Sequence, residues 1–175
     1  RTIKNFITML TTPDANGGVM INDWRASICG YRDFDYDPLH GHEAMVMNPF
    51  TRDPSELEAQ LAALKAEGGG DEPESLLDAL YTVVARGKTD KGEEPRTDAW
   101  RYASDAARCV VVFTDASFHP HMTTIPEGTV EDVIQLLQQE RIRLSLYAPD
   151  MKCYYDLSSL DKSVYEAIEY DETVR

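Results

Sequence analysis

Apolar residues recur every three or four positions in several parts of the chain, which is the period of an amphipathic helix. The clearest helix starts after Asp53, where Pro54 suits the first helical position and Glu56 completes a capping box. Further helices are predicted from about Pro73 to Ala85 and after Thr129. The side chains expected to face the core in these helices are Leu57, Leu61, Leu64, Leu76, Leu77, Leu80, Val84, Val130, Val133, Ile134 and Leu137. Weaker helical patterns cover residues 1–10, 99–107 and 158–169.

Between these helices, runs of apolar and β-branched residues predict strands at 24–31, 44–47, 109–113 and 142–148. The run from Cys109 to Phe113 is uninterrupted, which is typical of a strand buried on both faces in a parallel sheet. Alternating helices and strands predict a Rossmann-like α/β fold: a doubly wound, mostly parallel central sheet flanked by helices, with a short antiparallel edge strand. A length of 175 residues fits a single domain over 1–175.

A formal net charge of −14 makes nucleic acid and anionic membrane surfaces poor partners. No apolar run reaches the length of a membrane span. The cysteines are odd in number, and Cys29 and Cys109 lie in predicted strands, so we expect small buried thiols. This favours a cytoplasmic location, and a cell-surface location stays open.

Two acidic segments are expected at the carboxyl edge of the predicted sheet, where ligands of open α/β folds bind. One holds Asp115 and Ser117, directly after the uninterrupted strand, and the other runs from Gly68 through Asp71 to Glu74. Carboxylate and hydroxyl oxygens from separate loops suit a hard divalent cation. Each acid also has a simpler interpretation, because Asp71 or Glu72 could cap a helix, Asp115 could stabilise a turn, and Glu74 could be solvated.

Four segments together resemble the von Willebrand factor A domain: WRASICGYRD at 24–33, GGGDEPES at 68–75, VVVFTDAS at 110–117 and ERIRLSLYA at 140–148. They occur in order and span nearly the whole chain. The resemblance implies a metal-ion-dependent adhesion site, in the loop variant similar to integrin β subunits. By that match Glu74 and Asp115 are metal ligands, and Asp71 lies where a neighbouring metal binds. Gly70, Pro73, Ser117 and Asp33 are expected at the rim of this site. Asp33 has a second interpretation, in which it is buried and pairs with Tyr31 and Arg32 at the end of the 24–31 strand.

The resemblance further implies that Mg²⁺, or Ca²⁺ or Mn²⁺ in its place, bridges the protein to a Glu or Asp carboxylate of a protein partner. It implies a binding module without enzymatic activity. One departure matters, because the family's Asp-x-Ser-x-Ser motif does not occur in this sequence. The helical pattern already begins at Arg1, so we expect the first strand and this motif upstream. If the motif is missing altogether, the metal is expected to be missing as well.

Two other functions stay open at this point. One is a hydrolase of phosphate esters that uses Asp115 as nucleophile, although no phosphate-binding loop or nucleophile elbow occurs. The other is a metal-free structural domain within a larger protein. All four histidines fall in the pairs His40 with His42 and His119 with His121, which could bind a transition metal or lie solvated in loops.

Overall fold

The computed structural model describes residues 5, 8–9, 12–13, 17–18, 21–65 and 72–168. The chain divides into two compact units: Arg1–Gly30 with Val46–Glu67, and Tyr31–Met45 with Gly68–Arg175. The helix expected at 1–10 lies largely outside the described residues, and Gly70 and Asp71 lie outside them entirely. The assignment of one domain to the whole chain stays a prediction.

In the first unit, helix α2 (Pro54–Ala63) begins as the sequence predicts. The carboxylate of Asp53 accepts a hydrogen bond from the backbone N–H of Ser55 at 2.8 Å, which caps the helix. The expected capping box is wrong, because the Glu56 carboxylate accepts from the Thr51 hydroxyl and the Asp53 N–H donates to that same hydroxyl. Of the three leucines expected to face the core, Leu57 is buried, whereas Leu61 and Leu64 are half-buried.

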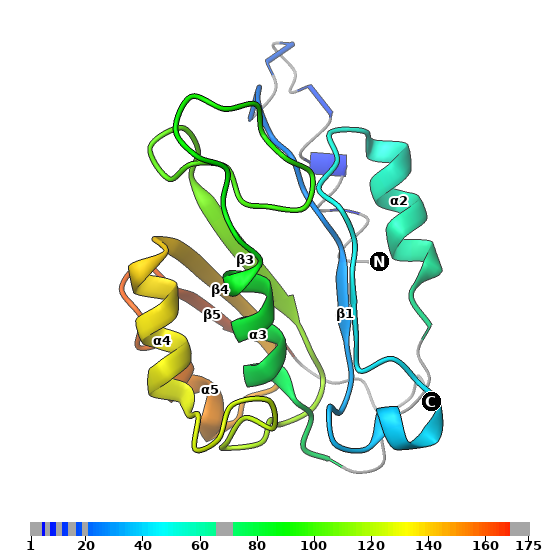
Figure 1. The fold of residues 1–175 in the computed structure, drawn as a ribbon, viewed down its shortest axis with the longest axis vertical. Helices are drawn as coiled ribbons and strands as arrows, with labels where there is room; N and C mark the ends of the chain where they lie inside the picture. Colours follow the sequence, from blue (N-terminus) through cyan, green and yellow to red (C-terminus); the bar gives the residue numbers. More distant parts are fainter. Residues whose placement is uncertain are drawn as a thin grey trace. The chain divides into compact units, whose positions relative to one another are not determined.

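Strands β1 (Cys29–Tyr31) and β2 (Met45–Met47) form a two-stranded antiparallel sheet (Figure 1). The strand expected at 24–31 is therefore much shorter than predicted. The backbone of Ile28 forms hydrogen bonds with side chains instead of with a neighbouring strand. Its N–H donates to Gln60 Oε1 at 2.9 Å, and its carbonyl accepts from Asn48 Nδ2 at 2.8 Å. A short 3₁₀ helix, η1 (Asp37–His40), lies between the strands and ends at Gly41 with φ +83°.

The second unit contains a parallel sheet in the order β3 (Arg108–Phe113), β4 (Ile142–Ala148) and β5 (Val164–Ala167). Helix α4 (Val130–Gln139) packs against β4 and contacts both α3 (Leu76–Ala85) and α5 (Lys152–Leu157), as Figure 1 shows. The α4 start at Thr129 is confirmed, with Asp132 completing a capping box. The mixed α/β class with a parallel sheet is confirmed.

Apolar side chains of these elements form the core of the second unit. The buried members include Leu76, Leu77, Leu80, Val84, Val112, Val133, Leu137, Leu144, Leu146, Tyr154 and Leu157. The four inward positions expected for α3 are all among them. No helix in the described residues is long and apolar enough to cross a membrane.

Two weaker helix predictions are wrong. Residues 99–107 contain no helix, because Trp100 pairs with Lys88 in a parallel bridge and its indole N–H donates to the Val83 carbonyl at 3.0 Å. Within 158–168, the chain forms β5 rather than a helix, and Tyr165 stands beside Leu146 in the register of β4. The helix of this region, α5, comes earlier than the apolar pattern predicts.

The expectation that Cys109 is buried is also wrong. Its residue is exposed, whereas Arg108 and Val112 of the same strand are buried, so β3 is not covered on both faces in the described structure. Cys29 and Cys153 are partly buried, and all three thiols are free.

Candidate functional site

The described parts of the two predicted acidic segments, residues 72–74 and 115–117, lie side by side at the carboxyl end of β3. Glu74 pairs with Phe118 in a parallel bridge. The Glu74 N–H donates to the Ser117 carbonyl at 2.9 Å, and the His119 N–H donates to the Glu74 carbonyl at 3.1 Å. In addition, Ser117 N–H donates to Glu72 Oε1 at 3.2 Å. These hydrogen bonds fix the loop before α3 against the turn that carries Asp115.

Two tyrosines support that turn from the core. The Tyr31 hydroxyl donates to Thr114 Oγ1 at 2.9 Å, and the Tyr154 hydroxyl donates to the Ala116 carbonyl. Burial raises the pKa of Tyr31 to about 12, and burial also raises the pKa of Tyr154. Both phenols therefore stay protonated donors at neutral pH. Sequence analysis missed Tyr154, because its partner stands 38 positions earlier in the chain.

Asp33 lies at the centre of a buried polar cluster; only 2% of its surface is accessible. Its Oδ1 accepts from the backbone N–H of Asp35 at 2.7 Å and of Tyr36 at 3.3 Å. The Ser75 hydroxyl also donates to it, at 3.3 Å, and accepts from the N–H of Phe34 at 3.0 Å. This serine precedes α3, so the cluster ties the segment after β1 to the start of that helix.

The other neighbours of Asp33 differ from those that its sequence context suggests. Arg32 would be the obvious partner, but its guanidinium donates to the Glu43 carbonyl at 2.7 Å. Instead, His119 Nε2 lies 3.5 Å from Asp33 Oδ2, a distance that suits an electrostatic contact better than a hydrogen bond. Burial opposes the ionisation of Asp33, but the two backbone N–H groups and His119 outweigh it and lower the pKa of this carboxyl.

Glu74 has the opposite electrostatic character. Its Oε2 atom is buried, and no group in the described part of the chain forms a hydrogen bond with it. Burial raises the pKa of Glu74, and the neighbouring carboxylates of Asp33, Asp37 and Asp115 raise it further, against the lowering effect of His119. Among the described residues, Glu74 Oε2 therefore has no hydrogen-bond donor, and the side chain lies near an excess of negative charge that a proton or a cation would compensate.

The described residues do not form a complete metal site by themselves: no three His, Cys, Asp or Glu side chains among them are arranged to hold one ion. Glu74 is half-buried and Asp115 is exposed, at the same end of β3. Pro73 directly precedes Glu74 and is half-buried. Gly70 and Asp71, which the sequence also suggests, cannot be placed because they lie outside these residues.

A scan against protein-family models finds no match to this chain, and a search of curated proteins finds no similar sequence. The geometry and the charges of the site therefore carry the functional argument.

Proposed function

We propose that this chain is a protein-binding module that uses a divalent metal ion to bind a Glu or Asp carboxylate of a partner. In this proposal Glu74 and Asp115 supply oxygen ligands, and Mg²⁺ is the ion, with Ca²⁺ or Mn²⁺ as substitutes. The observation that carries it is the buried Oε2 of Glu74, which has no hydrogen-bond partner in the described residues. The fold proposed for this function is of the von Willebrand factor A type.

A cation would relieve the electrostatic conflict at Glu74. An ionised carboxylate with a buried, unpartnered oxygen is unfavourable, and three further carboxylates act on it. A divalent ion compensates such charge more effectively than a single proton, and it is often the largest local charge in its site. Water and the partner's carboxylate would complete its coordination, because the described residues do not provide a full ligand set.

The metal also explains how an acidic protein could bind an acidic group. The chain carries a net charge of −14, so a partner carboxylate is repelled at long range. Binding at this edge therefore needs a local positive charge that outweighs the repulsion. Asp115 is exposed at the turn after β3, where a partner can reach an ion that it holds.

A second candidate is a metal-free domain with a purely structural role. The observation that favours it is the contact of 3.5 Å between His119 and Asp33, because His119 already favours the ionised form of Asp33 without a metal. In that case divalent ions would have no specific effect on the protein, which separates the two candidates experimentally.

The experiment measures thermal stability in EDTA and in MgCl₂, CaCl₂ or MnCl₂, with NaCl at equal ionic strength. The intact chain and its Glu74→Gln and Asp115→Asn variants are compared with Glu131→Gln, which removes an exposed acid on α4. An ion at 100 times its Kd should stabilise the wild type by about 2.7 kcal/mol. We expect that gain to persist in Glu131→Gln and to be lost in the two site variants.

In the absence of metal, Glu74→Gln also tests the direction in which the Glu74 charge changes stability. Folding raises the pKa of Glu74, so protonated Glu74 favours the folded state. This contribution to stability is fully present below the ordinary glutamate pKa of about 4.3 and is lost as the pH rises through the raised pKa. At neutral pH the variant should therefore be more stable than the wild type in EDTA. The metal proposal is refuted if each protein is as stable in EDTA as it is in every divalent ion.

The binding and hydrolase alternatives need separate readouts. Calorimetry with a short peptide that carries one glutamate, and with its glutamine counterpart, should show binding only for the glutamate peptide and only with metal. Turnover of p-nitrophenyl phosphate that is lost in Asp115→Asn would instead support the hydrolase.

A further inference from the structure

The opposite end of the parallel sheet, where β3 and β4 begin, holds a second cluster of charged residues. A cavity of about 210 Å³ lies there, lined in part by Lys88, Tyr102, Arg108, Glu140 and Arg141. Arg108 is the first residue of β3 and pairs in register with Ile142, the first residue of β4. This cavity is therefore separate from the turn that carries Asp115, which follows the last residue of β3.

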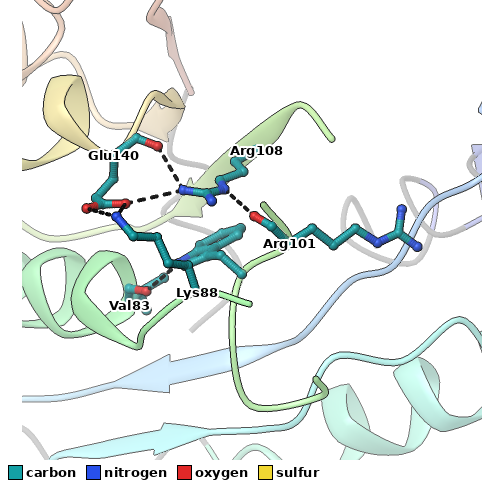
Figure 2. Close-up of polar contacts among 6 residues, drawn as sticks. Val83, Lys88, Arg101, Arg108 and Glu140 are labelled. Atoms are coloured by element: carbon teal, nitrogen blue, oxygen red, sulfur yellow. Dashed lines mark hydrogen bonds and ion pairs between the residues drawn. The ribbon is translucent and has the colours of Figure 1, made fainter. Parts of the chain in front are cut away.

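Arg108 is the central side chain of this cluster, and only 2% of it is accessible. Its Nε donates to the Arg101 carbonyl at 2.7 Å, and its Nη1 donates to the Glu140 carbonyl at 3.0 Å and to Glu140 Oε2 at 3.3 Å. Figure 2 shows the guanidinium between these two residues, with the side chain of Arg101 pointing away from the cluster. Three contacts thus fix the orientation of Arg108.

The remaining nitrogen of this guanidinium is not satisfied. Nη2 of Arg108 is buried, and no acceptor in the described residues forms a hydrogen bond with it. A buried donor without a partner is unfavourable, and more so when the group is charged. Because the other two nitrogens are held in place, Arg108 cannot turn Nη2 to solvent without breaking its existing bonds.

The residues around Arg108 carry an excess of positive charge, in contrast to the chain as a whole. The Lys88 ammonium lies 3.1 Å and 3.2 Å from the two carboxylate oxygens of Glu140, and 52% of the lysine side chain is exposed. Arg141 is also exposed. Three cationic side chains and one carboxylate among the lining residues give a formal local charge of +2.

We propose that this cavity binds a small oxyanion with the chemistry of a phosphate group, beside the Arg108 guanidinium that lines it. The exposed ammonium of Lys88 and the guanidinium of Arg141 complete the site, because both can swing toward an anion. A phosphate dianion matches the formal charge of the lining residues. Guanidinium groups bind phosphate through short, charge-assisted hydrogen bonds.

The test titrates the full chain with sodium phosphate at constant ionic strength, maintained with NaCl, and follows thermal stability and the ¹⁵N NMR signals of residues 139–142. The double variant Lys88→Gln/Arg141→Gln keeps Arg108, whose contacts with Arg101 and Glu140 support the fold. Arg143→Gln is the matched control, because this exposed arginine of β4 does not line the cavity.

We expect saturable phosphate binding that is at least about tenfold weaker in the double variant and unchanged in Arg143→Gln, since only the double variant loses charge-assisted hydrogen bonds to the anion. A second titration with O-phosphoserine separates a free phosphate ion from the phosphate of a larger ligand. The same response to chloride alone, or an equal loss in the double variant and in Arg143→Gln, would overturn the proposal. Glu74→Gln should bind phosphate as the wild type does, because Glu74 does not line this cavity. A failure of the proposed metal site is therefore distinguishable from a failure of phosphate binding.

Discussion

Asp78 should be one of the most important single side chains for the stability of the unit that carries the candidate site. It stands in the first turn of α3, and only 1% of its surface is accessible. Its Oδ2 accepts from the Thr123 N–H at 3.1 Å, and its Oδ1 accepts from the Thr124 N–H at 2.7 Å and from the Thr124 hydroxyl at 2.6 Å. One carboxylate thus holds the loop that follows His119.

The size of the effect follows from these three bonds. Asp78→Ala removes all three and leaves two backbone N–H groups without their acceptor, so we expect a loss of about 3–5 kcal/mol in the free energy of unfolding. Asp78→Asn keeps an oxygen at the position of Oδ1 and loses mainly the bond from Thr123, which should cost about 1–2 kcal/mol. Thr124→Val should also cost about 1–2 kcal/mol, because it removes only the hydroxyl bond.

Urea unfolding followed by circular dichroism measures these differences, provided that the m-value stays constant. The double variant Asp78→Ala/Thr124→Val should cost less than the sum of its parts, with a coupling of about 1–2 kcal/mol, because both changes remove the Thr124 hydroxyl bond. Asp161→Ala, at a side chain that is 85% exposed, should change stability by no more than about 0.5 kcal/mol. The reasoning is refuted if Asp78→Ala costs less than about 1 kcal/mol or if Asp78→Asn is equally damaging.

Three further predictions concern the polar contacts of the same unit. Tyr31→Phe should lower the free energy of unfolding by about 1 kcal/mol, because it removes the hydrogen bond to Thr114. Adding Thr114→Val should cause little further loss, since that same bond is already absent. Urea unfolding of the single and double variants checks this. Asp33 has a lowered pKa, so its ionised form contributes stability above the ordinary aspartate pKa of about 3.9, and that contribution is lost as the pH falls through the lowered value. Asp33→Asn should therefore flatten the acid side of the stability–pH curve, and a steep curve in the variant would contradict the assignment. Glu140→Gln should cost about 2 kcal/mol in the same unfolding assay, since it removes the carboxylate that balances the buried guanidinium of Arg108.

The sequence predicted best those features that depend on nearby residues. The caps at Asp53 and Thr129 bond within three positions, and the alternation from Ile142 to Ala148 appears as alternating burial in β4. The predictions at 24–31 and 158–168 failed for the opposite reason. Ile28 bonds to side chains 20 and 32 positions away, and β5 exists because β4 offers a pairing edge.

The same distinction applies to the candidate site. The sequence by itself determined that Glu74 and Asp115 belong to segments expected at one edge of a parallel sheet, since the carboxyl ends of parallel strands share an edge. Only the tertiary structure decided that Asp33 is buried against Ser75, 42 positions later, and that Glu74 Oε2 has no hydrogen-bond partner in the described residues. Burial and hydrogen-bond satisfaction depend on every segment that packs around an atom, so no local pattern contains them.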